Sequence, residues 1–382
     1  MKNFRDKKMT SSFVKKQTTR GRPNLPLGTK PSVGNNQLLV SSGIPSLDML
    51  IGGGIAIGTL VMIEEDLHRT YSNVMHKLFL AEGIKCKHSI FVANEETSMD
   101  EFIKDIPSCI DDVQKTAHVE EMKSTNTAND DELKIAWRYK NQPTTPKVVS
   151  TQFGHYFDLS EPVPEVKLKE VDYTCYQEDE TEVGKNGYYQ GLLKQITAKI
   201  KNQNLFTKDS KIIPPILRID LSAIGSPNWN IKLLNKDGFD SSLVWFLLAL
   251  KALLRSSFAC AMVSIPSHLF QSEKLLGRLR HCCDIVIDIE SLPVIEKHPL
   301  SKEYHGTMEI KRMSSLNCIN GQNIDTSDLA FKLKKKRFLI EKFHLPPDMG
   351  EAPSAPKPDN APKKSSTPLC GQMTPVNNVL DF

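Results

Sequence analysis

Short apolar runs of strand length alternate with amphipathic runs of helix length over much of the chain. Residues 72–82, for example, place Val74, Leu78 and Ala81 on one stripe of a helix, and Gly83 follows as a stop signal. Buried strands separated by helices pack as parallel neighbours with right-handed crossovers. The sequence therefore predicts an α/β fold with a mainly parallel, twisted sheet flanked by helices. Strands are expected at residues 59–63, 89–93, 216–221, 258–265 and 284–289, and helices at 72–82, 243–255 and 269–279.

Two later segments, residues 306–313 and 331–345, are more polar than these strands, and no helix-length pattern lies between them. Strands that follow one another without a crossover helix pair antiparallel. We expect the two segments to form an antiparallel hairpin at the edge of the sheet.

The two ends of the chain and one internal segment lack such patterns. Residues 1–36 hold nine Lys or Arg and one acidic residue, which predicts a disordered basic arm. Residues 346–382 hold eight of the 23 prolines, which predicts a disordered Pro-rich tail. Residues 37–345 are assigned to one domain, with a long, polar and partly disordered insertion at about residues 105–210.

Composition excludes several classes of protein. The chain has 382 residues, 39 % of them hydrophobic, and a net charge of +4, so it is not wholly disordered. The apolar run 243–254 contains Lys251 and is shorter than the ~20 residues that cross a bilayer, and the first 22 residues lack an apolar signal core. These features favour a soluble intracellular protein without membrane contact. The eight cysteines show no zinc spacing, and the His281-Cys282-Cys283 run lacks a second ligand cluster, so no metal site is predicted.

Residues 41–93 are the most specific part of the sequence. Gly43-Ile44, Leu47-Asp48 and Gly52-Gly53-Gly54-Ile55 lead directly into the strand expected at 59–63. This pattern resembles the entry to a RecA/KaiC-type P-loop domain, which implies a RecA-like sheet. In that family a glycine-rich loop after the strand ends in Gly-Lys-Thr/Ser, whose backbone N–H groups and lysine bind phosphates and whose hydroxyl holds magnesium.

The corresponding loop in this chain lacks the groups that bind phosphate. Glu65 stands in place of the first glycine, Thr70 replaces the second glycine, and Tyr71 replaces the lysine. Ser72 alone keeps its chemistry. Each lost charge-assisted hydrogen bond is worth roughly 1.5–3 kcal/mol, and Glu65 and Asp66 add negative charge. The sequence therefore predicts a degenerate phosphate loop and no nucleotide cofactor.

Two other positions keep the chemistry of a RecA-like ATPase. Glu95 follows the strand at 89–93, where KaiC-like enzymes carry glutamates that activate water, and Asp220 lies where an aspartate would bind magnesium. Carboxylates at the ends of parallel strands also cap helices or stay solvated. We interpret both residues as vestiges and predict no catalytic residue and no enzymatic activity. A divergent KaiC-like ATPase that uses Arg69 and Glu95 is the alternative.

Four further islands narrow the resemblance. They are residues 134–139 (Lys-Ile-Ala-Trp-Arg-Tyr), 153–159 (Phe-Gly-His-Tyr-Phe-Asp-Leu), 331–338 (Phe-Lys-Leu-Lys-Lys-Lys-Arg-Phe) and 344–347 (His-Leu-Pro-Pro). Together with the glycine-run entry and the degenerate loop, they resemble the PAXNEB family, which is the fourth subunit of the Elongator complex. The resemblance spans about residues 41–347 and is firm only in these islands.

This resemblance implies a non-catalytic RecA-like subunit. It would join Elongator subunits five and six in a hetero-hexameric ring, which docks on the Elongator core subunits, binds tRNA and supports modification of the wobble uridine of the anticodon. Such a subunit is expected in the cytoplasm and the nucleus. A RecA-like accessory protein of DNA recombination, which would bind DNA through the basic arm and the late basic strand, is a further alternative.

Two sets of side chains are candidates for these contacts. Aromatic and arginine side chains in polar segments anchor a chain on its partner, so the partner-interface candidates are Trp137, Arg138, Tyr139, Phe153, His155, Tyr156 and Phe157. Basic side chains bind RNA phosphates without sequence preference, so the RNA-binding candidates are Lys311, Arg312, Lys334, Lys335, Lys336 and Arg337. Packing of the aromatics on the chain's own sheet and protection of an edge strand by lysine are the competing interpretations.

Overall fold

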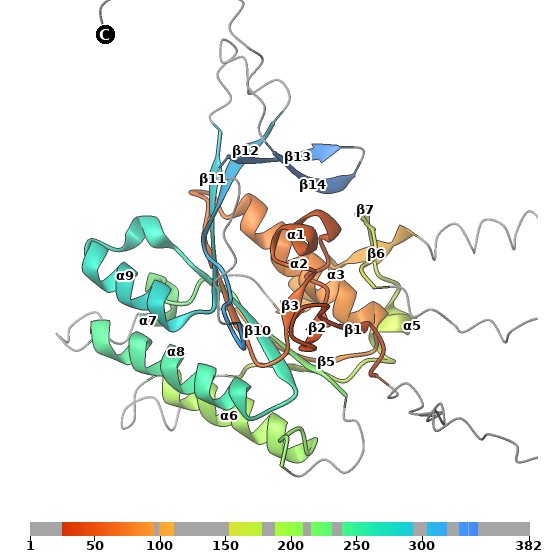
Figure 1. Cartoon of the computed structure of the whole chain (residues 1–382), viewed down its shortest axis with the longest axis horizontal. Helices are drawn as coiled ribbons and strands as arrows, with labels where there is room; N and C mark the ends of the chain where they lie inside the picture. The colour runs from red at the N-terminus through yellow and green to blue at the C-terminus, as the bar shows by residue number, and fades with distance from the viewer. Residues whose placement is uncertain are drawn as a thin grey trace, which may run out of the picture. The chain divides into compact units, whose positions relative to one another are not determined.

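The fold is that of a computed structural model (Figure 1). The structure describes residues 25–94, 99–110, 153–177, 188–208, 215–230, 239–292, 304–318, 328–334 and 336–342. The chain divides into two units, Met1–Phe343 and His344–Phe382, and every described residue belongs to the first unit.

The described residues form one main sheet of nine strands, in the order β14-β13-β12-β11-β4-β10-β9-β5-β8. The strands from β11 to β8 run parallel, and β12, β13 and β14 continue the sheet in antiparallel pairs. The parallel strands are β4 (Leu60–Glu64), β5 (Ser89–Ala93), β8 (Tyr173–Cys175), β9 (Leu217–Leu221), β10 (Ala259–Ile265) and β11 (Ile285–Ser291). The predicted α/β fold with a mainly parallel sheet is therefore confirmed.

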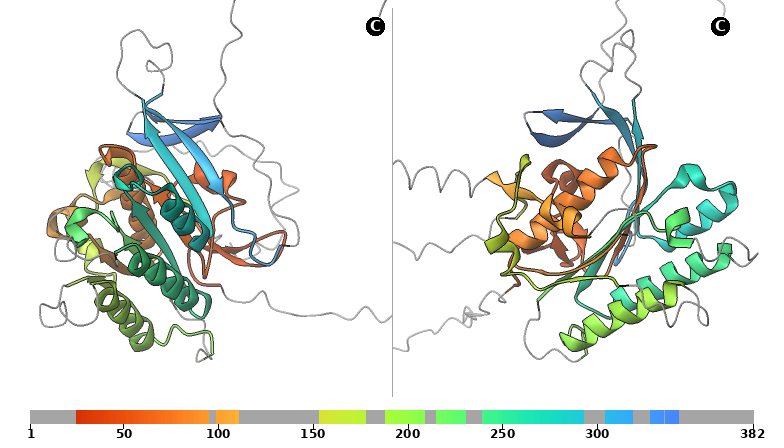
Figure 2. Two further views of the ribbon diagram at one scale, coloured as in Figure 1. Left: turned by 90° about the vertical axis from the view of Figure 1, so that its left-hand side faces the viewer. Right: turned by 180° about the vertical axis from the view of Figure 1, so that it is seen from behind.

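Helices cover both faces of this sheet (Figure 1 and Figure 2). One face carries α1 (Pro45–Leu50), α2 (Thr70–Lys85), α3 (Met99–Lys104) and a small sheet of β1 (Thr29–Pro31), β2 (Leu38–Val40) and β3 (Ile55–Ala56). The other face carries α6 (Tyr188–Asn202), α7 (Pro227–Asn230), α8 (Phe239–Arg255) and α9 (Glu273–Cys282), with η2 (Ser267–Leu269) before α9. Among the described helices, none has both the length and the apolar character needed to cross a membrane.

Two apolar cores follow from the alternation of side chains along the strands. Val61 and Ile63 of β4 belong to the core that contains Phe79 of α2, whereas Leu60 belongs to the core that contains Leu247 of α8. Successive side chains of a strand point to opposite faces of the sheet, and burial on both faces produces the continuous apolar runs seen in the sequence. The same packing fixes α2 against the sheet, so that its first turn follows the carboxyl end of β4.

The predicted antiparallel pairing at the edge of the sheet is confirmed, but the extension contains one strand more than the predicted hairpin. β12 (Gly306–Arg312) pairs with β11 and with β13 (Leu329–Lys334), but residues 331–345 do not form a single strand. The chain turns after Lys334, and β14 (Arg337–Lys342) runs back along β13. Lys336 has a left-handed backbone (φ 73°) in this turn. The sequence does not reveal the turn because the basic run contains none of the Gly, Pro or Asn residues that mark turns.

The predicted insertion at residues 105–210 supplies several elements of the fold. β8 extends the parallel sheet beyond β5, and α6 packs beside α8. β6 (Pro107–Cys109) pairs with β7 (Phe157–Pro162), and α5 (Glu165–Leu168) follows. At the N-terminal side, β1 lies within the predicted basic arm, so residues 25–36 belong to the fold and not to a disordered tail.

Candidate functional site

The carboxyl end of β4 is the place where this fold offers a binding crevice. β4 and β10 are neighbours in the sheet, but the chain leaves β4 through α2 on one face and leaves β10 through α9 on the other face. Ligands of open parallel sheets bind where neighbouring strands diverge in this way. Residues 65–69 fill this position, and α2 begins directly after them. The degenerate loop therefore lies where a phosphate would be expected.

The carboxylate of Asp66 occupies the N-terminus of α2. Its Oδ2 accepts a hydrogen bond from the backbone N–H of Thr70 (2.9 Å), and its Oδ1 accepts from the backbone N–H (3.0 Å) and the Oγ (2.9 Å) of Ser72. Asp66 is only 1 % exposed. The first N–H groups of a helix and an adjacent hydroxyl are the groups that bind phosphate and magnesium in a working loop. An internal carboxylate thus takes the place of a ligand.

Glu65 and Arg69 close the loop toward the sheet. One oxygen of the Glu65 carboxylate accepts a hydrogen bond from Ser264 Oγ of β10 (2.5 Å), and the other lies 3.2 Å from Nε of Arg69. Arg69 has a left-handed backbone (φ 54°), a conformation that a glycine adopts without strain. Because its guanidinium pairs with Glu65, Arg69 neutralises an internal carboxylate in this structure.

Tyr71, at the position of the lysine, packs against the antiparallel extension. The centroid of its ring lies 4.6 Å from that of Phe331 in β13 and 6.2 Å from that of His305. Burial and the nearby Asp66 carboxylate raise the pKa of the Tyr71 hydroxyl, which is therefore neutral at pH 7. The position that carries positive charge in a phosphate loop here attaches α2 to β13.

Asp220 in β9 is fully buried against α2. Its Oδ1 lies 2.5 Å from Nδ1 of His76, and neither side chain is exposed. Burial raises the pKa of the Asp220 carboxyl, although His76 acts in the opposite direction. The carboxyl group at the position of a magnesium ligand thus forms a hydrogen bond with His76 of α2. The other predicted vestige, Glu95, lies outside the described residues.

These contacts do not fit a bound nucleoside triphosphate. Its phosphates would meet the buried carboxylate of Asp66, and the N–H groups of Thr70 and Ser72 that should bind them already donate to Asp66. Like charges repel strongly at a buried site, where water screens them little. The structure therefore supplies a physical reason for the predicted loss of phosphate binding, and no step of nucleotide chemistry is assigned to this loop.

Sequence reasoning missed two of the residues that occupy the site. In the sequence, Asp66 is noted only as an added negative charge, and nothing distinguishes His76 from other polar residues of a helix. Aspartate is favoured just before a helix, but Asp66 lies four residues before Thr70, and the left-handed turn at Arg69 separates it from the usual capping position. The usual spacing rule therefore does not detect it.

The glycine-run entry has a packing role of its own. Gly43 has φ +85°, and a Cβ at this position would lie 2.1 Å from the carbonyl oxygen of Leu78 in α2. Gly54 has φ +135°, and its Cβ would lie 2.6 Å from the carbonyl oxygen of Val40. Only glycine fits such close backbone contacts. The motif therefore keeps its structural purpose without a nucleotide.

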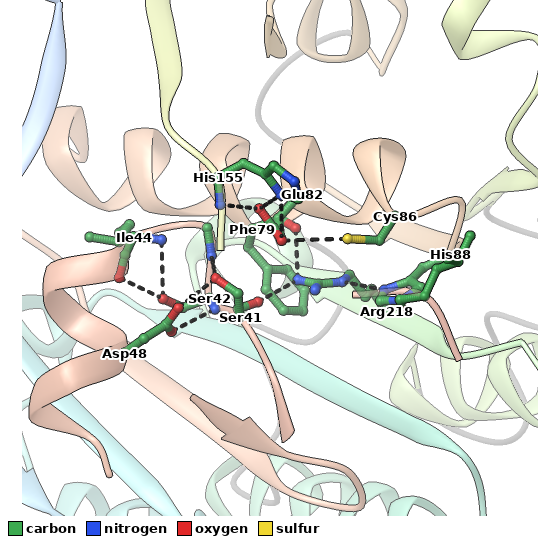
Figure 3. A network of polar contacts seen from close by, with 12 residues as sticks. Ser41, Ser42, Ile44, Asp48, Phe79, Glu82, Cys86, His88, His155 and Arg218 are labelled. Carbon is green, nitrogen blue, oxygen red and sulfur yellow. Dashed lines mark hydrogen bonds and ion pairs between the residues drawn. The ribbon is translucent and has the colours of Figure 1, made fainter. Parts of the chain in front are cut away.

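A buried polar network joins this entry to α2 and β9 (Figure 3). The Asp48 carboxylate accepts a hydrogen bond from Ser41 Oγ (2.5 Å), and burial raises the pKa of Asp48. Arg218 of β9 donates from Nη1 to the carbonyl oxygens of Ser41 (2.9 Å) and Phe79 (3.0 Å), and from Nε to Nδ1 of His88 (3.0 Å). One buried guanidinium thus connects three separate parts of the chain.

A second part of this network centres on Glu82 of α2 (Figure 3). Its carboxylate accepts from the backbone N–H of His155 (3.1 Å) and lies 3.1 Å from His155 Nδ1 and 3.4 Å from Cys86 Sγ. Burial would raise the pKa of Glu82, but His155 and Arg218 lower it overall, whereas burial raises the pKa of Cys86 to about 12. Within the described residues, these three side chains are the one group whose ligand atoms lie close enough to hold a metal. A protonated thiol and the nearby Arg218 favour a hydrogen-bonded network, and we assign no metal to it.

Comparison with known proteins assigns the chain to a family. The model described as PAXNEB protein matches residues 22–373. The chain belongs to the PAXNEB family. Its relatives include Elongator complex protein 4 of Danio rerio, 42 % identical over 360 residues that cover 90 % of both chains. The protein of the same name from Homo sapiens is 36 % identical over 386 residues, covering 93 % of this chain and 88 % of the relative.

Solved structures that are similar to this PAXNEB protein include one that is described as KaiC-like. A KaiC-like protein from Pyrococcus horikoshii matches with a TM-score of 0.42 and 13 % sequence identity, covering 79 % of this chain and 98 % of that chain. The fold of the PAXNEB chain is defined here by its own strand order and register.

The described partner-interface candidates of this PAXNEB protein mostly pack on their own chain. His155 and Phe157 are buried, and Phe153 lies 3.8 Å from a lysine ammonium. Tyr156 is 44 % exposed, with the guanidinium of Arg337 5.0 Å from its ring. His155 and Phe157 are therefore corrected to core residues, because this segment folds back on α2. Trp137, Arg138 and Tyr139 lie outside the described residues.

Two of the RNA-binding candidates have structural roles in this PAXNEB protein. Lys311 pairs with the buried Glu64 of β4 (2.9 Å) and with Asp288 of β11 (2.6 Å). Arg312 donates to the backbone carbonyl oxygen of His281 (2.8 Å). Both side chains thus fasten β12 to its neighbours, which argues against a primary role in binding RNA.

The other RNA-binding candidates lie at the β13–β14 turn. Lys334, Lys336 and Arg337 are exposed, and Lys336 pairs with Asp158 at 3.2 Å. Lys335 lies outside the described residues. The turn presents these cations on the rim of the sheet, so their proposed contact with RNA remains open to test.

Proposed function

We propose that this chain acts as a non-catalytic, RecA-like subunit of the Elongator complex. In this proposal it joins Elongator subunits five and six in a hetero-hexameric ring, and the ring docks on the Elongator core subunits. The ring binds tRNA and supports modification of the wobble uridine in the anticodon, in the cytoplasm and the nucleus. Similarity to proteins named Elongator complex protein 4 supports a role in this complex.

The Asp66 carboxylate at the N-terminus of α2 is the observation that carries the non-catalytic assignment. A catalytic RecA-like site needs this position for phosphates. Among the described residues, the parallel sheet and α2 are nevertheless present. Fold and function are separable, so a RecA-like fold can persist without phosphate binding. This combination supports a function in assembly.

The proposed contact with tRNA is assigned, among the described residues, to the β13–β14 turn. Lys334, Lys336 and Arg337 are exposed there, whereas Lys311 is engaged by Glu64. Exposed cations bind phosphates without reading sequence, which suits recognition of a folded RNA by its shape. Replacing the three exposed residues by glutamine should therefore weaken tRNA binding and reduce its salt dependence.

Co-expression of the chain with the two partner subunits tests the proposal. The chain alone should neither hydrolyse ATP nor bind it saturably up to about 1 mM, and it should purify with both partners in one ring that retains tRNA. ATP hydrolysis by the isolated chain that Asp220→Asn abolishes would overturn the non-catalytic assignment. A chain that purifies without the two partners would overturn the ring.

The two alternative functions have distinct outcomes. An ATPase that uses Arg69 has less support, because Arg69 pairs with Glu65. An accessory protein of DNA recombination would bind single-stranded DNA at least as tightly as tRNA at the same salt concentration. A clear preference for tRNA would favour the Elongator subunit.

A further inference from the structure

A cavity lies at the opposite end of α2 from the degenerate loop. It has a volume of about 230 Å³ and is lined by the last turn of α2, the β6–β7 pair and the segment of α5. α2 has 16 residues, which places its two ends roughly 24 Å apart at 1.5 Å per residue. The cavity is therefore separate from the site at the carboxyl end of β4.

The interior of the cavity combines an apolar floor with one buried hydroxyl. Ala81 and Ile84 of α2 and Phe157 of β7 line it, and all three are buried. Ser108 of β6 also lines it and is 7 % exposed. Within the described residues, the Ser108 Oγ has no hydrogen-bond partner. A buried hydroxyl in this state favours a ligand that offers it a hydrogen bond.

The rim of the cavity is basic. Lys85, Lys87 and Lys167 line it together with one acidic residue, Glu170. Lys87 and Glu170 form an ion pair of 3.1 Å, in which their side chains are 64 % and 55 % exposed. Exposed ion pairs contribute little stability, so this pair can exchange for a stronger anion. Lys85 also offsets the partial negative charge at the C-terminus of α2.

We propose that this cavity binds a nucleoside monophosphate, either as a free nucleotide or as one nucleotide of an RNA strand. The base enters the cavity and hydrogen-bonds to Ser108 Oγ, and the phosphate lies at the lysine rim. This binding goes beyond the proposed function and does not depend on assembly of the ring.

The unpaired hydroxyl favours a base over the apolar anchor of an acidic peptide. The edge of a base carries donors and acceptors that pair with Ser108, whereas a leucine or phenylalanine side chain would leave the hydroxyl buried and unpaired. The cavity is smaller than the roughly 300–1,000 Å³ of pockets for drug-sized ligands, which suits one base. Lysine ammonium groups bind phosphate as point charges, so the three lysines at the rim match the phosphate group of the nucleotide.

Titration of the full chain with uridine 5′-monophosphate and adenosine 5′-monophosphate, followed by calorimetry, tests the proposal. At least one nucleotide should bind with a Kd of about 1 mM or tighter, and the matching nucleoside without phosphate should bind at least about tenfold more weakly. Ser108→Ala should weaken binding about 3- to 10-fold, and Lys87→Gln combined with Lys167→Gln by at least about tenfold. The matched control is Lys274→Gln, which changes an exposed lysine of α9 on the other face of the sheet and should leave binding unchanged.

Competition with a short single-stranded RNA distinguishes the two sources of the ligand. If the RNA displaces the nucleotide, and Ser108→Ala weakens RNA binding to the same extent, the ligand is a nucleotide of an RNA strand. If the RNA does not compete, the ligand is a free nucleotide. The proposal is overturned if neither nucleotide binds saturably, if the Ser108 and lysine variants bind as tightly as the unaltered chain, or if only a leucine-containing acidic peptide binds. The lysine variants alter only the rim and stay informative if Ser108→Ala unfolds the chain. Ring assembly measured on the same variants shows separately whether the proposed function holds.

Discussion

At the scale of single residues, Asp66 should stabilise the fold through the hydrogen bonds that it accepts at the degenerate loop. Asp66→Ala removes the acceptor of three hydrogen bonds at the start of α2. Loss of a helix cap costs about 0.5–2 kcal/mol and hydrogen bonds to a charged group about 1.5–3 kcal/mol, so the free energy of unfolding should fall by about 2–3 kcal/mol. Asp66→Asn keeps one acceptor oxygen and should lose less. Urea unfolding measures both, and an unchanged midpoint in Asp66→Ala would show that the carboxylate does not stabilise the loop.

His88 gives the fold a defined dependence on pH. Its Nδ1 accepts a hydrogen bond from Arg218 (3.0 Å) and its Nε2 donates to the carbonyl oxygen of Leu27 (2.8 Å), so the ring is neutral in the folded chain. Burial, reinforced by Arg218, lowers the pKa of His88 to about 3. The unfolded chain takes up this proton near pH 6.5, so the contribution of the neutral ring is complete above that pH and is lost as the pH falls toward 3.

The measurement compares the unaltered chain with His88→Gln between pH 7 and pH 5. The unfolding free energy of the unaltered chain should fall more steeply below pH 6.5, by at most about 1.4 kcal/mol per pH unit, and the difference between the two chains should shrink accordingly. The raised pKa of Asp48 and the lowered pKa of Glu82 belong to both chains, which is why the comparison uses the difference between the two curves. Parallel curves would show that His88 does not titrate differently on folding.

At the scale of elements, Tyr71 holds the antiparallel extension against α2. Tyr71→Ala removes the ring contact with Phe331 of β13 and should lower the unfolding free energy by about 1–3 kcal/mol, with faster hydrogen exchange in β13. Tyr71→Phe keeps the ring and should change little. Tyr71→Lys restores the ammonium of a phosphate loop, but it should not restore ATP binding while Asp66 occupies the helix N-terminus. Equal exchange rates in Tyr71→Ala and the unaltered chain would contradict this attachment.

The elements that the sequence predicts well are those buried on both faces. β4, β5, β10 and β11 appear as mainly apolar runs because each of them contacts both cores, whereas β9 places Leu217, Ile219 and Leu221 in one core and the buried Arg218 and Asp220 on its other face. β6 and β8 have three residues each, and β7 is buried only at Phe157, so none of these strands shows an apolar pattern long enough to detect. The β13–β14 turn is also missed, because its sequence contains no turn-forming residues. Periodicity therefore finds the centre of this sheet but misses β8 at one edge and the turn between β13 and β14 at the other.

The same limit applies to the candidate site. The missing glycines and lysine are visible in the sequence because a phosphate loop is one continuous segment. The contacts of His76 with Asp220 and of His155 with Glu82 join residues far apart in the chain, and only the packing of α2 brings them together. This is why the sequence pattern at 153–157 predicts a partner surface, whereas Phe157 packs in the chain's own core and the buried His155 contacts Glu82.

At the scale of the whole molecule, a non-catalytic subunit should leave any ATP hydrolysis by an assembled ring unaffected when its own vestigial site is changed. Asp220→Asn keeps an oxygen for the hydrogen bond with His76 but removes the carboxylate that a magnesium ion would need. In a ring rebuilt with the two partner subunits, turnover should stay within about twofold, whereas loss of a metal-binding aspartate in a working site would exceed tenfold, or about 1.4 kcal/mol. Asp172→Asn, at an exposed aspartate that pairs with Lys199, is the matched control, and size-exclusion chromatography shows that both rings assemble. A tenfold loss in Asp220→Asn with an intact ring would mean that this subunit takes part in hydrolysis, and that Asp66 must leave the helix N-terminus when the ring forms.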